Sequence, residues 1–156
     1  MFTDIEYNMT YLTISIAGNT ADEMNEHFRQ AKAQGAEAIE VRLDGIKGLT
    51  PTLAGELVMT ARKTKLPVIA TCREKDEGGV KSFSIADKTA ILGECVKAGA
   101  EFIDCELKVF AQKEVQETIK QLLKSHPDCR LILSAHQFKG PFANLNMKYE
   151  AMLSLW

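Results

Sequence analysis

The sequence predicts an α/β fold in which five successive strand–helix units form part of a (β/α)8 TIM-type barrel. Five apolar runs recur at the spacing of βα units, and an amphipathic helical pattern follows each run. Strict alternation with short connections predicts a parallel sheet with right-handed crossovers. Polar and charged residues gather at the carboxyl ends of the runs. At 156 residues the chain is short for a closed barrel, so we expect one domain, 1–156, holding an incomplete one.

Each predicted element has its own signal in the chain. The strands are rich in β-branched and apolar residues and span Tyr11–Ala17, Ala38–Asp44, Pro67–Arg73, Glu101–Leu107 and Arg130–His136. The helices repeat apolar residues at three- and four-residue steps and span Thr20–Gln34, Thr52–Lys65, Ser84–Lys97, Val115–Ser125 and Asn144–Trp156. No linker, low-complexity tract or second domain interrupts these units.

Cap residues support the first three helices. Thr20, Thr50 and Ser84 precede helical patterns as side chains that can accept the first free N–H groups. The turn Gly18-Asn19-Thr20 could also cradle a phosphate, but the acidic residues of the following turn would repel one, so we interpret it as a cap. Gly35 and Gly99 mark helix exits. The segments that they begin resemble two copies of one helix-to-strand connection.

Two architectures fit five such units, an open doubly wound sheet of the flavodoxin type and an incomplete barrel. Parallel strands covered by helices should be apolar throughout, yet several of these strands carry charge near their carboxyl ends. An open sheet would divide these side chains between two faces, whereas a barrel brings them together in one mouth, which favours the barrel. The polar strand-end residues are Glu40, Arg42, Asp44, Thr71, Arg73, Asp104, Glu106, Ser134 and His136.

Each charged group has both a structural and a functional interpretation. The run Glu40, Arg42 and Asp44 could be an ion-pair ladder at a sheet edge, or it could hold Arg42 in position for a hydroxyl or carboxylate. Asp104 and Glu106 could pair with that arginine or contact a substrate directly. His136 could be structural, but a strand end beside Ser134 favours an acid/base role.

Composition excludes several classes of partner and site. A formal charge of -2 without basic runs argues against nucleic acid and anionic membranes as partners. The four cysteines stand far apart without metal-ligand spacing, so we expect reduced, buried thiols and no metal site. Met1–Asn8 lacks the pattern of a targeting peptide, and we expect a cytoplasmic protein.

Four segments resemble, in order and spacing, the motifs of type I 3-dehydroquinate dehydratases. They are Glu40–Asp44, Pro67–Arg73 with Glu77-Gly78-Gly79, Ile103–Glu106 and Ser134–Phe138. The resemblance implies a (β/α)8 barrel of the shikimate pathway that converts 3-dehydroquinate into 3-dehydroshikimate through a lysine Schiff base. It implies no metal or organic cofactor.

The resemblance also implies roles for single residues. His136 matches the general acid/base, and Glu77 matches the carboxylate that orients it. Ser15, Glu40, Arg42 and Arg73 match groups that hold the substrate, and Asp44, Asp104 and Glu106 are supporting residues. Gly78 and Gly79 would let the loop after Arg73 turn sharply and carry Glu77 over the mouth.

The chain also departs from the family pattern. The family's Schiff-base lysine lies on a sixth strand, and this sequence ends at Trp156 within the fifth unit, so we expect these 156 residues alone to be nearly inactive. Lys139 and Lys148 are expected to be solvated surface charges. Unpaired strand edges predict a homo-oligomer.

Three classes of function remain open: a dehydratase, a catalytically silent member that binds a ligand or partner, and a flavodoxin-like binding domain.

Overall fold

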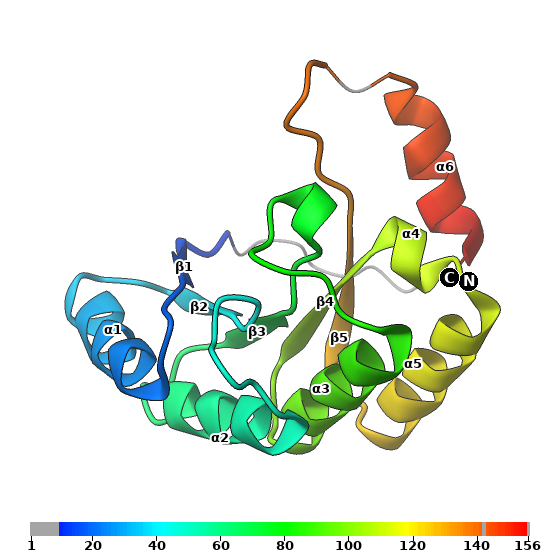
Figure 1. Ribbon diagram of the computed structural model, residues 1–156. Coiled ribbons are helices and arrows are strands. Elements are labelled where there is room, and N and C mark those ends of the chain that lie inside the picture. Colours follow the sequence, from blue (N-terminus) through cyan, green and yellow to red (C-terminus); the bar gives the residue numbers. More distant parts are fainter. Residues whose placement is uncertain (1–9, 142, 156) are drawn as a thin grey trace.

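The computed structural model describes residues 10–141 and 143–155 (Figure 1). Within them, five parallel strands form one sheet in the order β1-β2-β3-β4-β5. The strands are β1 (Thr13–Ile16), β2 (Ala38–Arg42), β3 (Val68–Thr71), β4 (Phe102–Glu106) and β5 (Arg130–Ser134). The prediction for Met1–Asn8 and the last residue of the predicted fifth helix, Trp156, lie outside the described residues.

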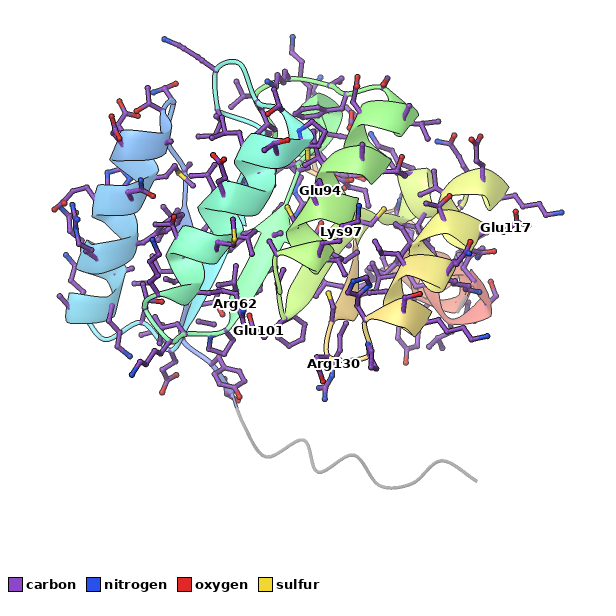
Figure 2. The ribbon with its side chains drawn as sticks, turned by 90° about the horizontal axis from the view of Figure 1, so that it is seen from below. Arg62, Glu94, Lys97, Glu101, Glu117 and Arg130 are labelled. Atoms are coloured by element: carbon purple, nitrogen blue, oxygen red, sulfur yellow. The ribbon has the colours of Figure 1, made fainter. Side chains whose placement is uncertain are left out.

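The helices show that the sheet is wound in one direction only. They are α1 (Ala21–Ala33), α2 (Pro51–Arg62), α3 (Ile85–Lys97), α4 (Leu107–Phe110), α5 (Lys113–Ser125) and α6 (Leu145–Leu155), with a 3-10 turn, η1 (Lys75–Glu77). Figure 2 shows α1, α2, α3 and α5 side by side over one face of the sheet. A flavodoxin-type sheet has the order 2-1-3-4-5 with helices on both faces, so that alternative is wrong. Consecutive order with helices on one face is the wall of a (β/α)8 barrel.

The two faces of the sheet differ sharply in composition. On the helix-covered face, Ile39, Val41, Val68, Ala70 and Ile103 are fully buried in the core. The opposite face is the interior of the incomplete barrel. Its side chains are set by register, since Ser15 is level with Glu40, Arg42 with Thr71, and Thr71 with Asp104. The period of two in a strand therefore sends the apolar residues outward to the helices and the polar ones inward.

The predicted cap residues and glycine exits of the helices are confirmed. The hydroxyls of Thr20, Thr50 and Ser84 accept backbone N–H groups at 3.3, 3.1 and 3.0 Å. Gly35 and Gly99 have φ of +87° and +91°, values that only glycine adopts readily. In both exits the next residue donates its N–H back into the helix, from Ala36 to Ala31 and from Ala100 to Cys95. The two connections are thus the same C-terminal motif.

Two short elements were not predicted. The turn η1 lies in the loop after β3, helix α4 follows β4 directly, and each is too short to show a periodic pattern. The predicted strands extended as many as two residues past the carboxyl ends of the observed strands because the polar ends, such as Arg73, leave the sheet to enter the loops. None of the helices in the described ranges has the length and apolar character needed to cross a membrane.

Candidate active site

Asp44 is the anchor at the end of the second strand. Its carboxylate accepts from Arg42 Nε at 2.8 Å and from Arg42 Nη2 at 3.0 Å, as a two-point pair. It also accepts the backbone N–H groups of Val80, at 2.9 Å, and Arg73, at 3.4 Å. Burial opposes ionisation of Asp44, but the bonds from Arg42 and Val80 outweigh it and hold the pKa below its usual value. Asp44 thus fixes the Arg42 guanidinium and ties β2 to the loop after β3.

Arg73 is held by the fourth and fifth strands. One nitrogen, Nη1, lies 2.7 Å from Ser134 Oγ, 2.9 Å from Asp104 Oδ1 and 3.4 Å from Glu106 Oε1. Ser134 in turn donates to Asp104 at 2.8 Å. Burial is the largest influence on Asp104 and raises its pKa despite the nearby Arg73. Pairing of Asp104 and Glu106 with Arg42, which the sequence allowed, is wrong: the guanidinium that they bind is that of Arg73, because β3 is the strand next to β4.

Lys88 and Glu74 also belong to this cluster, and neither was predicted. Lys88 Nζ lies 2.5 Å from Glu106 Oε2 and 3.1 Å from Glu74 Oε1, and its side chain is 2% exposed. Burial disfavours its charge, but the two carboxylates raise the pKa of Lys88, so the amine is an ammonium and no nucleophile. A signal was present in the sequence. Lys88 falls on the apolar stripe of its helix, three and four residues before Ile91 and Leu92.

The loop after the third strand carries Glu77 to His136. Glu77 Oε2 accepts the backbone N–H of His136 at 2.8 Å and lies 3.2 Å from its Nδ1. Two glycines permit this path. Gly78 has φ of +92°, and a Cβ at Gly79 would stand 2.0 Å from the carbonyl oxygen of Arg73. Arg42 Nη2 donates to the carbonyl of Gly78 at 3.2 Å, which joins the loop to the Arg42–Asp44 pair.

Glu40 and Ser15 lie beside this group on the interior face. Glu40 is half-buried on β2, two residues before Arg42 and on the same face of the strand. The pKa of Arg42 is raised mainly by Asp44, and the charge of Glu40 adds to this effect. Ser15 is exposed on β1, level with Glu40. Neither side chain hydrogen-bonds to another site residue in the ranges that the structure describes.

The two lysines near the end of the chain and the four cysteines lie outside this cluster of hydrogen-bonded residues. Lys139 is exposed, as expected, but Lys148 is half-buried and lines a hollow of about 430 Å³ that also contains Glu77 and Ala135. Lys148 is therefore less exposed than the sequence predicted. Among the described residues no cluster of His, Cys, Asp or Glu has a metal-binding arrangement. The four cysteines are free and buried, as predicted.

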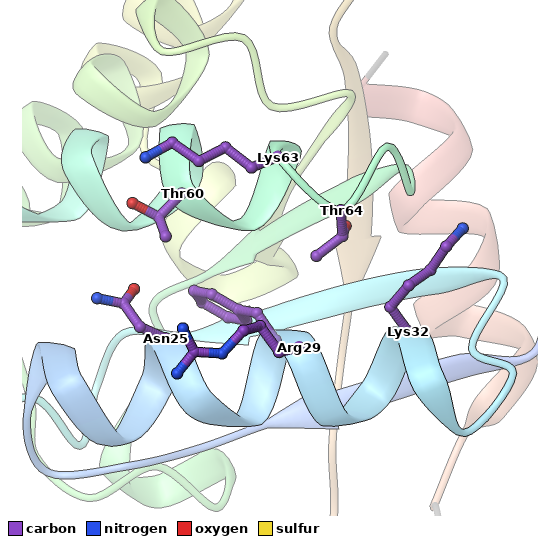
Figure 3. A pocket seen from close by; sticks show the side chains of 7 residues that line it. Asn25, Arg29, Lys32, Thr60, Lys63 and Thr64 are labelled. Carbon is purple, nitrogen blue, oxygen red and sulfur yellow. The ribbon is translucent and has the colours of Figure 1, made fainter.

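A second hollow lies outside the barrel wall. It is a groove of about 440 Å³ between α1 and α2, lined by Asn25, Phe28, Arg29, Lys32, Thr60, Lys63 and Thr64 (Figure 3). It lies on the helical side of the sheet and shares no residue with the cluster at the strand ends. The residues that converge are those of the interior face.

Comparisons with known proteins agree with this fold. The family model for type I 3-dehydroquinase matches residues 12–155. A 3-dehydroquinate dehydratase of Methanopyrus kandleri is 33% identical over 126 residues, which are 81% of this chain and 53% of the relative. A bifunctional 3-dehydroquinate dehydratase/shikimate dehydrogenase of Arabidopsis thaliana is 28% identical over 88% of this chain and 22% of its own length. The chain thus spans about half the length of its single-function relative.

Solved structures share the fold. The 3-dehydroquinate dehydratase of Enterococcus faecalis superimposes with a TM-score of 0.82 at 22% identity, over 93% of this chain and 62% of that one. The enzyme of Geobacillus kaustophilus gives a TM-score of 0.83 at 14% identity, over 95% and 59%. The matched family model covers nearly all of the sequence. The chain therefore belongs to the type I 3-dehydroquinase family.

Proposed function

We propose that this chain supplies the substrate-binding and proton-transfer groups of a 3-dehydroquinate dehydratase. The observation that carries the proposal is the contact of Glu77 with both the backbone N–H and Nδ1 of His136, at 2.8 and 3.2 Å, beside two fixed arginines. An oriented imidazole next to cationic groups suits removal of a proton from an anionic, hydroxylated substrate. Membership of the family supports the same reaction.

His136 would act through its other ring nitrogen. With Nδ1–H donated to Glu77, the lone pair stands on Nε2, which can take the proton beside the iminium carbon. The electron pair of that C–H bond then forms the enamine. Expulsion of the neighbouring hydroxyl follows, and the imidazolium returns its proton to that hydroxyl, so water leaves. Glu77 stabilises the transient positive charge on His136.

The arginines would hold the substrate rather than react with it. Arg42 and Arg73 keep fixed positions on carboxylates and present planar donors to carboxylate and hydroxyl oxygens. Glu40 and Ser15 add an acceptor and a hydroxyl on the same face. Fixed donors reduce the ordering cost of binding, which favours one orientation of the ring over His136.

The proposed reaction also needs a Schiff-base amine. The family resemblance puts that lysine on a sixth strand, and the residues that the structure describes form the first five. The ammonium of Lys88 does not serve, because it is bound by two buried carboxylates. We therefore propose activity for the barrel that contains these five units together with three further βα units.

Two measurements test the proposal. Calorimetry should show that the 156-residue chain binds 3-dehydroquinate, and that Arg73→Met weakens binding while Lys97→Met, an exposed lysine paired with Glu94 on α3, does not. Addition of the last three βα units of the Methanopyrus kandleri relative should then give dehydration, followed by the ultraviolet absorbance of the conjugated product. Binding without turnover in the completed barrel would identify a silent, ligand-binding member instead.

A further inference from the structure

The buried carboxylates next to Arg73, those of Glu74 and Glu106, are bound by a side chain from a helix, Lys88. Lys88 stands in the first turn of α3, and its ammonium crosses the core to the carboxyl end of β4, where it meets Glu106. Side chains of Lys88 and Glu106 are 2% and 1% exposed. A buried ion pair of this kind is costly unless its remaining bonds are made, so its partners define what it does.

Glu106 connects Lys88 to Arg73. Its Oε2 accepts from Lys88, while its Oε1 accepts the backbone N–H of Glu74 at 2.9 Å and faces Arg73 Nη1 at 3.4 Å. Glu74 follows Arg73 in the chain and binds Lys88 through its own carboxylate at 3.1 Å. Lys88 therefore reaches Arg73 by two routes, one through the Glu106 side chain and one through the backbone at residue 74.

Charge explains why the ammonium is needed. Arg73 shares its surroundings with three carboxylates, those of Asp104, Glu106 and Glu74, and a single guanidinium cannot balance them in a buried site. Burial alone would raise the pKa of Glu106, but the bonds from Lys88 lower it, so Glu106 stays ionised and accepts from Arg73. Cys72 and Cys105 flank the cluster with raised pKa values and remain neutral thiols.

The guanidinium divides its nitrogens between structure and ligand. All three of the side-chain contacts found for Arg73 in the described residues converge on Nη1. Nε and Nη2 have no side-chain acceptor among those residues. The anchored nitrogen thus determines where the other two donors point.

We infer that Lys88 is a positioning residue, which fixes the substrate-binding donors of Arg73 through Glu106 and Glu74. This inference rests on the proposed function for the ligand itself, 3-dehydroquinate, but the orientation of Arg73 is testable without any ligand. If Lys88 positions Arg73, the specificity of the site depends on a side chain from the helical layer.

The test compares Lys88→Met, Lys88→Arg and Glu106→Gln with the parent chain, and Lys97→Met is the matched control on the same helix. Figure 2 shows Lys97 beside Glu94 on the outer surface. Calorimetry with 3-dehydroquinate should give about tenfold weaker binding for Lys88→Met and for Glu106→Gln, the loss expected for one charged hydrogen bond. Lys88→Arg should restore most of it, and Lys97→Met should match the parent chain.

A double variant separates positioning from general damage. Because the two residues share the route through Glu106 but Lys88 also holds Glu74, Lys88→Met added to Glu106→Gln should weaken binding by less than the sum of the two single losses. The variant Glu106→Gln leaves Lys88 paired with Glu74, so it tests the route if Lys88→Met does not fold. Parent-like binding by a folded Lys88→Met or Glu106→Gln variant would refute the inference.

Nuclear magnetic resonance of 15N-labelled arginine gives a readout without ligand. The Nε–H signal of Arg73, assigned by its loss in Arg73→Lys, should be sharp in the parent chain, Lys97→Met and Lys88→Arg. It should broaden or move in Lys88→Met and in Glu106→Gln. If the parent chain does not bind 3-dehydroquinate, the proposed function fails, and this signal still decides the inference: an unchanged signal in a folded Lys88→Met variant overturns it.

Discussion

One carboxylate oxygen of Glu77 receives the backbone N–H of His136 at 2.8 Å and lies 3.2 Å from Nδ1 of the same residue, 59 positions along the chain. The backbone and the ring of His136, just after β5, are thus oriented by the loop after β3. Substitution of Glu77 with Gln keeps an oxygen acceptor but removes the negative charge. In a completed barrel, this change should slow dehydration by roughly ten- to a hundredfold, because the imidazolium loses its counter-charge.

The variant His136→Ala provides a second dehydration rate with which Glu77→Gln can be compared. Loss of the acid/base itself should cost about 10²–10⁴ in rate, more than Glu77→Gln. Steady-state rates of both variants, measured in the same completed barrel, provide the check. Equal rates for Glu77→Gln and the parent would mean that the carboxylate only shapes the loop.

The Arg42–Asp44 pair should make stability depend on pH. The folded pKa of Asp44 lies below its ordinary value, so its contribution is fully present above the unfolded pKa and is lost as pH falls through the folded one. Asp44→Asn should lower the free energy of unfolding by about 2 kcal/mol at pH 7, since four hydrogen bonds to a charged acceptor are weakened.

Urea unfolding of the parent chain and of Asp44→Asn at pH 7 and at acid pH measures this difference. It should shrink as the pH is lowered. The control is Asp76→Asn, an exposed carboxylate paired with Lys108, which should change stability little. A difference that is constant with pH would contradict the linkage.

Two glycines give a matched pair of alanine substitutions. Gly79→Ala forces a Cβ against the backbone at Arg73 and should destabilise the fold by about 2 kcal/mol or more while displacing the Glu77 loop. Gly93→Ala, in the middle of α3 with no atom within 4 Å of the new Cβ, should stabilise by about 0.5–1 kcal/mol. Thermal unfolding of both variants checks the signs, and a harmless Gly79→Ala would show that the loop takes another path.

The cysteines should be inert in the folded protein. Burial raises the pKa of Cys72 and Cys105 to about 12 and that of Cys129 to about 11, and it also raises that of Cys95. Because only the thiolate reacts, a thiol reagent at pH 8 should label none of the four before unfolding and all four afterwards. Mass spectrometry counts the labels, and rapid labelling of the native chain would contradict the described packing.

Sequence patterns predicted the repeated elements well because each has a strong local signal. Strands β2 and β5 begin at the predicted residues, and Thr20, Thr50 and Ser84 cap their helices. The charged residues at the strand ends predicted a barrel rather than a doubly wound sheet, because only the strand order of a barrel brings these side chains together. Local pattern was sufficient wherever the contact lay within one unit.

Partners across units were harder to predict. Asp104 and Glu106 bind Arg73 rather than Arg42 because of sheet register, which no local window contains. Lys88 was overlooked because a lysine in a helix is normally exposed. Its position on the apolar stripe of its helix indicated that the side chain is buried.

The proposed function requires that residues from separate strand ends form one site for 3-dehydroquinate. Chemical-shift mapping of the labelled chain during titration with 3-dehydroquinate tests it directly. We expect the shifted signals to cluster on Arg42, Arg73, Glu77 and His136. Shifts confined to the α1–α2 groove, or none at saturating ligand, would contradict it.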